Sequence, residues 1–275
     1  MAGARQASGE WIGERNLLAG GFRVFFRYSV RPSVWQLPVV LVHGLGLSGR
    51  YMLPTAQCLA PHFPVYVPDL PGFGGSEKPA YTLDVPQLAD ALAAWITAAG
   101  LERVMLLGNS FGCQIIADLA ARRPELVERA VLQGPTTPPD ERSWWRQFRR
   151  WRQNQPYNPR ALDPVTWSDY RKCGYRRLLQ TFRYSLRDPI EAKLPQIRCP
   201  VLVVRGELDP ICRQPWAEQV AARIPHGRLV QIPAVAHTLV FTAPAQLAAV
   251  TEQFLADAAP GREEFLADAA PGAGR

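Results

Sequence analysis

The sequence predicts a doubly wound α/β fold, in which a mostly parallel sheet carries helices on both faces, with one inserted helical subdomain. Short runs of aliphatic and β-branched residues alternate with helical patterns along most of the 275 residues, which is typical of parallel sheets. Most of these runs are apolar throughout, as strands buried on both faces require. With 47% hydrophobic and 20% charged residues, the chain has enough apolar side chains to bury a sizeable core.

The expected elements follow the chain in regular alternation. The expected strands are Phe22–Val30, Val39–Val42, Val65–Val67, Val104–Leu107, Ala130–Leu132, Val201–Val204 and Leu229–Ile232. Between most of them, apolar residues recur at the spacing of a helix face. The expected helices are Met52–Ala60, Val85–Ala99, Phe111–Arg122, Trp216–Ile224 and Ala243–Ala258.

The alternation stops at residues 136–194, a stretch rich in Arg, Trp and Tyr. It is too long for a connection between two strands, so we expect an inserted subdomain there. The predicted organisation is a core of residues 1–135 and 195–258, the insertion at 136–194, and a flexible tail at 259–275.

Two amphipathic helices are expected in the insertion. Trp144, Phe148 and Trp151 recur at helical spacing, with arginines off the stripe, and a second helix is expected to run from Trp167 through Phe182. We expect both apolar stripes to pack onto the core. The alternative is a helix that lies on a membrane surface.

The basic charge of the chain is confined to the same region. The net charge is +7, but residues 140–198 contain 14 Lys and Arg against 6 Asp and Glu, whereas the rest contains 17 against 18. No nucleic-acid recognition motif accompanies the arginines. We therefore expect no nucleic-acid partner.

Near the C-terminus, the eight residues from Phe254 to Gly261 recur unchanged from Phe265 to Gly272. A period of 11 residues repeated once does not make a solenoid. We interpret it as a local duplication, in which the first copy ends the last helix and the second forms the tail; the alternative is a partner-docking peptide.

Cysteine usage and hydropathy bear on location. The five cysteines are scattered, without CxxC pairs or zinc-like spacing with histidines, which favours a reducing compartment and hence a cytoplasmic protein. The first residues lack the apolar region of an export signal, and no apolar stretch reaches the ~18 residues of a membrane-spanning helix. We therefore expect neither export nor a membrane span.

The segment from Val104 to Gly112 carries the strongest chemical signal. It joins an apolar strand to a helical pattern through Gly108-Asn-Ser-Phe-Gly112, a G-x-S-x-G sequence. Such a strand-to-helix turn crowds the backbone around Ser110, so side chains at the two flanking glycines would clash. We predict that Ser110 is a nucleophile raised above the sheet edge.

A serine nucleophile needs a base and a carboxylate to orient that base. Of the four histidines, His237 alone follows the last strand, at the carboxyl edge where Ser110 also lies, whereas His43, His62 and His226 do not fit this position. Asp209 lies just beyond the strand that begins at Val201, with Glu207 as its neighbouring rival. The predicted catalytic residues are therefore Ser110, Asp209 and His237, in that chain order.

The chain resembles the α/β-hydrolase superfamily from about residue 22 to residue 258. Four motifs carry the resemblance: His43-Gly-Leu-Gly46, Asp69-Leu-Pro-Gly-Phe-Gly-Gly-Ser76, Gly108-Asn-Ser-Phe-Gly112 and the Asp209/His237 pair. The resemblance implies that the backbone N–H groups of Leu45 and Phe111 form an oxyanion hole. It also implies that the insertion at 136–194 is a cap over the substrate and that residues 72–75 form a turn near the site.

The predicted function is a serine hydrolase that cleaves a carboxylic ester or related acyl compound through an acyl-enzyme, without a metal or organic cofactor. The expected partner is a small acyl substrate, apolar or aromatic. Carbon–carbon bond hydrolases of ring-fission products remain an alternative because of Asn109 and of cap arginines such as Arg183 or Arg187, although those enzymes usually carry a tryptophan soon after the catalytic histidine and Thr238-Leu-Val-Phe241 stands here. Lactone opening and perhydrolysis use the same residues, and a non-catalytic ligand receptor is the alternative from another class.

Overall fold

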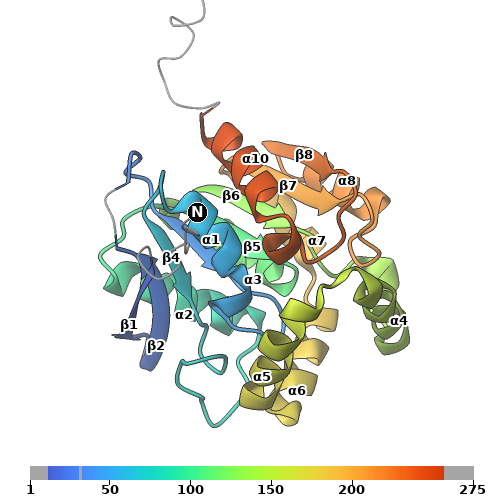
Figure 1. Ribbon diagram of the computed structural model, residues 1–275, viewed down its shortest axis with the longest axis horizontal. Coiled ribbons are helices and arrows are strands. Elements are labelled where there is room, and N and C mark those ends of the chain that lie inside the picture. Colours follow the sequence, from blue (N-terminus) through green and yellow to red (C-terminus); the bar gives the residue numbers. More distant parts are fainter. Residues whose placement is uncertain (1–11, 31–32, 257–275) are drawn as a thin grey trace, which may run out of the picture.

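A computed structural model describes residues 12–30 and 33–256. Eight strands in these residues form one sheet (Figure 1). The strand order is β1-β2-β4-β3-β5-β6-β7-β8. The first two strands run antiparallel to their neighbours, and all the other pairs are parallel. The strands are β1 (Ile12–Ala19), β2 (Phe22–Ser29), β3 (Val39–Val42), β4 (Val65–Pro68), β5 (Val104–Asn109), β6 (Val127–Gln133), β7 (Val201–Gly206) and β8 (Gly227–Ile232).

The seven expected strands are all present, with ends that differ by a few residues. An eighth strand, β1, was not predicted; it pairs along its whole length with β2. Gly20 and Gly21 form the turn between the two strands, both with positive φ (56° and 82°). A Gly-Gly pair between two strands is a hairpin signal. The polar residues of β1 hid the strand, because β1 lies at the edge of the sheet and half of its residues are exposed.

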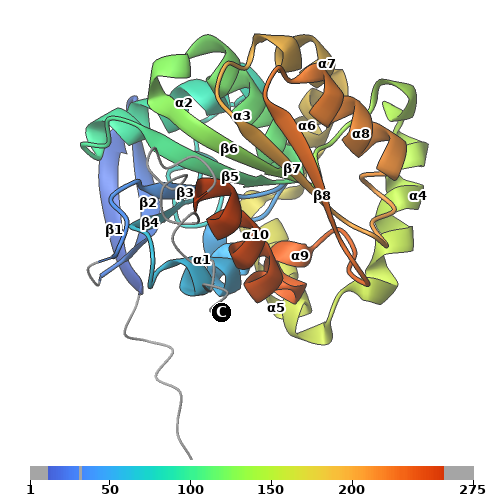
Figure 2. The same ribbon diagram turned by 90° about the horizontal axis from the view of Figure 1, so that it is seen from above.

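Helices cover both faces of the sheet (Figure 2). One face packs against α2 (Val85–Ala98), α3 (Phe111–Arg122) and α8 (Gln214–Arg223), and the other against α1 (Leu53–Leu59) and α10 (Pro244–Ala256). A capping box fixes the start of α2, since the Asp84 side chain accepts from the Gln87 N–H and the Gln87 side chain accepts from the Asp84 N–H. These helices match the expected ones in order and closely in extent.

The strands in the middle of the sheet hold the core. All residues of β3, β5 and β7 are buried, as strands covered on both faces require. The expected helix through Ala258 is described only as far as Ala256, and most of the duplicated segment lies outside the described residues. Among the described residues, no helix is long and apolar enough to cross a membrane.

Residues 136–194, called the cap segment below, stand between β6 and β7 and contain four α-helices, the first three of which lie at the lower right of Figure 1. They are α4 (Trp144–Asn154), α5 (Asp163–Cys173), α6 (Tyr175–Arg187) and α7 (Ile190–Lys193). The prediction of one helix from Trp167 through Phe182 was wrong. Gly174, with φ 80°, ends α5 and starts α6, because glycine takes this conformation without steric cost.

The prediction for the aromatic stripe of α4 was also wrong. Trp144, Phe148 and Trp151 are 42%, 46% and 40% exposed, so the stripe does not pack onto the core. The buried residues of α4 are Gln147 and Asn154. An amphipathic pattern shows that a helix has two faces, but here the inward face is the polar one, because its side chains find buried hydrogen-bond partners.

Candidate active site

Ser110 lies at the turn between β5 and α3, with φ 56° and ψ −117°. A positive φ is uncommon for a residue with a side chain and marks a strained turn. Neighbouring glycines make this turn possible: a Cβ at Gly112 would overlap the carbonyl oxygen of Val42, and one at Gly108 would lie 2.7 Å from Ile116 Cδ1. Ser110 is half-buried and stands at the carboxyl end of the central strands, as its sequence motif predicted.

His237 and Asp209 form a buried hydrogen-bonded pair. His237 Nδ1 lies 2.8 Å from Asp209 Oδ2. The other carboxylate oxygen, Oδ1, accepts from the backbone N–H groups of Ile211 (2.8 Å) and Cys212 (2.9 Å). The Nε2 of His237 is buried and has no hydrogen-bond partner within the described part of the chain. The pair thus fixes the orientation of the imidazole and leaves one ring nitrogen for another group.

Gln133, at the end of β6, links the loop of His237 to Ser110. Its backbone oxygen accepts from Ser110 N (2.9 Å), and its side-chain Nε2 donates to the backbone oxygen of His237 (3.0 Å). Asn109 donates to the same His237 oxygen at 3.5 Å. The next residue, Gly134, packs so closely that a Cβ there would lie 2.9 Å from His237 Nδ1. These contacts bring the loops after β5, β6 and β8 together at one edge of the sheet.

The rival residues do not join this cluster. His43 uses both ring nitrogens: Nε2 accepts from Leu70 N, and Nδ1 lies 3.0 Å from Gly44 O. Burial lowers the pKa of His43, which keeps its imidazole neutral. His62 pairs with Glu252 at the surface, and His226 is exposed before β8. Glu207 is exposed and accepts from Ala234 N rather than from His237.

The turn that carries Leu45 lies beside the nucleophile turn. Gly44 N donates to Tyr51 Oη (2.8 Å), which donates to Asn109 Oδ1 (2.5 Å). Within the described hydrogen bonds, the backbone N–H groups of Leu45 and Phe111 have no acceptor. The Phe111 N–H is also in the first turn of α3, where backbone N–H groups lack helical partners.

Two buried aspartates hold the loop that follows Leu45. Asp169 of α5 accepts from the backbone N (2.9 Å) and Oγ (2.6 Å) of Ser48. Asp69 accepts from the backbone N–H groups of Gly49 (2.7 Å) and Gly75 (2.8 Å). The glycine-rich segment 72–75 is therefore a turn packed on this loop.

The cap segment reaches the site in two places. At Gly46 (φ 73°), a Cβ would overlap Leu178 Cδ1 and lie 3.1 Å from the Tyr170 ring. At the end of α4, Asn154 accepts from the backbone N of His237 (3.2 Å) and is 2% exposed. Sequence reasoning found neither Asn154 nor Gln133, because each acts on a residue far along the chain. Burial of a polar residue is the only signal, and it is seen in the structure alone.

No group of three or more His, Cys, Asp or Glu side chains that could hold a metal ion occurs among residues 12–30 and 33–256. The groups at the sheet edge include the hydroxyl of Ser110, the imidazole of His237, the carboxylate of Asp209 and backbone N–H groups. This set is suited to acyl transfer.

The chain belongs to the alpha/beta hydrolase family, which it matches over residues 39–250. It is 29% identical over 243 residues, covering 78% of this chain and 75% of the relative, to a 2-hydroxymuconate semialdehyde hydrolase of Pseudomonas sp. (strain CF600). It is 34% identical over only 102 residues to a probable 1-acylglycerol-3-phosphate O-acyltransferase of Oryza sativa subsp. japonica, and spans 25% of that protein and 35% of its own length in the match.

The fold is also that of a solved thermophilic esterase from Thermogutta terrifontis, with a TM-score of 0.75 and 20% identity. The similarity covers 89% of this chain and 98% of that one. The resemblance to α/β hydrolases noted in the sequence is therefore confirmed, and so is the predicted fold.

Proposed function

We propose that this protein is a serine hydrolase that cleaves carboxylic esters or related acyl compounds through an acyl-enzyme on Ser110, His237 and Asp209. The observation that carries the proposal is the buried Asp209–His237 hydrogen bond at 2.8 Å, which leaves Nε2 without a partner among the described residues at the sheet edge where Ser110 stands. A base held in this way fits the removal of a proton from a serine hydroxyl.

The proposed reaction has two halves. Ser110 Oγ attacks the acyl carbon and gives its proton to His237 Nε2, which passes the proton to the leaving alcohol as the ester C–O bond breaks. Water then attacks the acyl carbon and gives a proton to His237, and Ser110 recovers a proton as the acid leaves. The N–H groups of Leu45 and Phe111 hold the oxyanion, and Asp209 stabilises the imidazolium.

The cap segment favours an uncharged acyl group over an acidic substrate. Most of its eleven arginines, including Arg183 and Arg187, are exposed. The half-buried ones already have partners: Arg142 pairs with Glu191, Arg150 with Glu141, and Arg177 donates to two backbone oxygens. The groups beside Gly46 are Tyr170 and Leu178. We therefore infer an apolar or aromatic substrate.

A second candidate is carbon–carbon bond hydrolysis of a ring-fission product. The similarity to the Pseudomonas 2-hydroxymuconate semialdehyde hydrolase, which extends over about three quarters of both chains, favours it. Against it, Asn109, which had suggested this chemistry, is buried and hydrogen-bonded to Tyr51 and Gln133, so its side chain is engaged within the protein.

We further expect the enzyme to act in the cytoplasm, as the scattered cysteines suggest; all five are free.

Lactone opening and perhydrolysis would use the same residues. A receptor without catalysis would bind such compounds and release them unchanged.

Two measurements test the proposal. A fluorophosphonate probe is expected to label the wild type and not Ser110→Ala, and equal labelling of both would remove Ser110 as the nucleophile. A panel of p-nitrophenyl esters of increasing chain length, one lactone and one ring-fission dienoate then ranks the substrates. A preference for the esters supports the proposal, a preference for the dienoate replaces it with the second candidate, and binding without turnover supports a receptor.

A further inference from the structure

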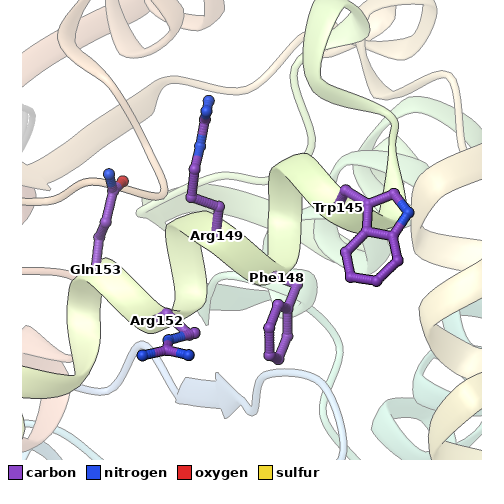
Figure 3. A pocket seen from close by; sticks show the side chains of 5 residues that line it. All are labelled: Trp145, Phe148, Arg149, Arg152 and Gln153. Atoms are coloured by element: carbon purple, nitrogen blue, oxygen red, sulfur yellow. The ribbon is translucent and has the colours of Figure 1, made fainter.

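The outer face of α4 combines exposed aromatic side chains with arginines that have no carboxylate partner among residues 12–30 and 33–256. Trp145 is 80% exposed, more than any other exposed large hydrophobic side chain among the described residues. Arg149 and Arg152 are exposed and form no ion pair in the described part of the chain. Together with Phe148 and Gln153 they line a shallow, open pocket on α4 (Figure 3). This pocket includes none of the catalytic candidates.

The polar face of α4 is held to the rest of the protein, so the helix cannot rotate to bury its aromatic and basic face. Arg150 pairs with the buried Glu141 (2.6 Å), Gln147 donates to the Glu141 backbone oxygen (3.2 Å), and Asn154 accepts from His237 N. The aromatic and basic face is therefore a fixed surface of the folded protein.

The same two properties extend over the cap segment. Of the fourteen large hydrophobic side chains that are exposed among residues 12–30 and 33–256, eight lie in the cap segment. Near the α4 surface, Trp144 packs edge-on against Phe182 of α6, with ring centroids 4.5 Å apart, and Phe148 stacks on Trp151 at 5.8 Å. The surplus of basic over acidic residues occurs in the same region of the sequence.

We propose that the outer face of α4, defined by Trp145, Phe148, Arg149 and Arg152, docks on the surface of an anionic phospholipid bilayer. An interfacial helix places aromatic rings at the boundary between headgroups and acyl chains, and its arginines extend to the lipid phosphates. The helix α4 contains four arginines and no acidic residue. Of these, only Arg150 is in an ion pair with a described residue, Glu141, so the positive charge of the outer face complements an anionic surface. A nucleic acid shares the negative charge but provides no apolar layer for Trp145.

The docking surface does not depend on the proposed catalytic reaction. Binding can therefore be measured on the full chain carrying Ser110→Ala. This substitution prevents lipid turnover from changing the vesicles. Sedimentation is measured with vesicles of phosphatidylcholine alone and of phosphatidylcholine mixed with phosphatidylglycerol, at low and at high salt. We expect binding to the mixed vesicles only, and its loss at high salt.

The variants test the surface itself. Replacing both arginines, Arg149→Gln with Arg152→Gln, is expected to lower the partition coefficient about 30-fold, and Trp145→Ala about tenfold. The matched control is Arg198→Gln with Arg223→Gln, which removes two exposed arginines outside the cap segment and is expected to change binding less than about threefold. Because all five side chains are exposed, unchanged thermal unfolding is expected throughout.

Three results would overturn the proposal. Equal binding to neutral and anionic vesicles would remove the role of the arginines. Equal losses in the α4 pair and in the control pair would show a net-charge effect without a docking face. Binding of a single-stranded oligonucleotide that depends on Arg149 and Arg152, with no binding to vesicles, would assign the surface to nucleic acid.

Discussion

The core and the cap segment of this protein are held together by different kinds of contact. In residues 136–194, nine polar or charged residues are buried against five hydrophobic ones, whereas in the rest of the described chain 63 buried hydrophobic residues stand against 15 polar ones. The core is stabilised mainly by burial of apolar surface. The cap segment is held by specific hydrogen bonds and ion pairs, several of which end on the loops of the candidate active site.

This difference separates two tasks. Apolar packing gives a rigid sheet whose edge holds Ser110, His237 and Asp209 in place. Polar contacts, such as Asn154 with His237 and Asp169 with Ser48, depend on direction and distance, so they hold the cap segment in one position against the loops that carry His237 and Ser48. Variants that affect one region without the other test this difference between the core and the cap segment.

The largest effect is expected in the core site. Asp209→Asn is expected to lower kcat by roughly 10²–10⁴ with the fold intact, because His237 loses the carboxylate that orients it. Steady-state kinetics with the best ester of the panel measures this change, and circular dichroism checks the fold. Glu207→Gln is the control and should leave kcat nearly unchanged; a loss in the control, with normal activity in Asp209→Asn, would transfer the role to Glu207.

The second effect concerns stability. Leu41→Ala, in the middle of β3 and fully buried, is expected to reduce the free energy of unfolding by about 2–5 kcal/mol through lost burial and a cavity. Leu179→Ala makes the same change on α6, where the side chain is 46% exposed, and should cost less than about 0.5 kcal/mol. Urea denaturation measures both, and similar losses would contradict the contrast between core and cap segment.

The third effect tests the contact between α4 and His237. Asn154→Leu removes the acceptor of the His237 N–H and is expected to lower kcat about tenfold with little change in KM, because the imidazole is less well placed. Asn154→Asp keeps an acceptor oxygen and should recover most of the rate, with a shifted pH profile.

Gln147→Leu is the control for this contact, since it removes another buried polar side chain of α4 that does not reach the site. If Gln147→Leu lowers kcat as much as Asn154→Leu does, the effect comes from general packing of the cap segment.

The proposed mechanism has its own control. Activity of Ser110→Ala equal to that of the wild type would show that Ser110 is not the nucleophile.

The smallest effect is a pH dependence of stability in the core. Because burial lowers the pKa of His43 from 6.5, the unfolded chain binds a proton more readily than the folded one. Stability from this group is therefore fully present above pH 6.5 and is lost as the pH falls below that value. The slope of unfolding free energy against pH in that range, measured by urea denaturation, should be smaller in His43→Gln than in the wild type. An equal slope in both would remove this role of His43.

The sequence predicted the core better than the cap segment, for a physical reason. Buried parallel strands are apolar throughout, and the G-x-S-x-G turn needs glycines at fixed positions, so both leave local signals. The edge strand β1, half of whose residues are exposed, lacks such a pattern. In α4 the periodicity of Trp144, Phe148 and Trp151 predicted a helix correctly but not the face that turns inward.

The residues that link the parts of the site could not be predicted from local patterns. Gln133 bonds a residue 104 positions away, and Asn154 one 83 positions away. Their roles depend on which loops the fold brings together. By contrast, Ser110, Asp209 and His237 each follow a strand whose carboxyl end lies at the same edge, so the strand pattern was enough to propose them.

Trapping the acyl-enzyme tests most directly whether Ser110 is the nucleophile. The protein is mixed with a p-nitrophenyl ester, quenched with acid, and digested, and the peptides are analysed by mass spectrometry. We expect the mass of one acyl group on the peptide that contains Ser110, and none on that peptide in Ser110→Ala. Turnover of the ester with the acyl group on another residue, or with the same labelling pattern in Ser110→Ala, would exclude Ser110 as the nucleophile.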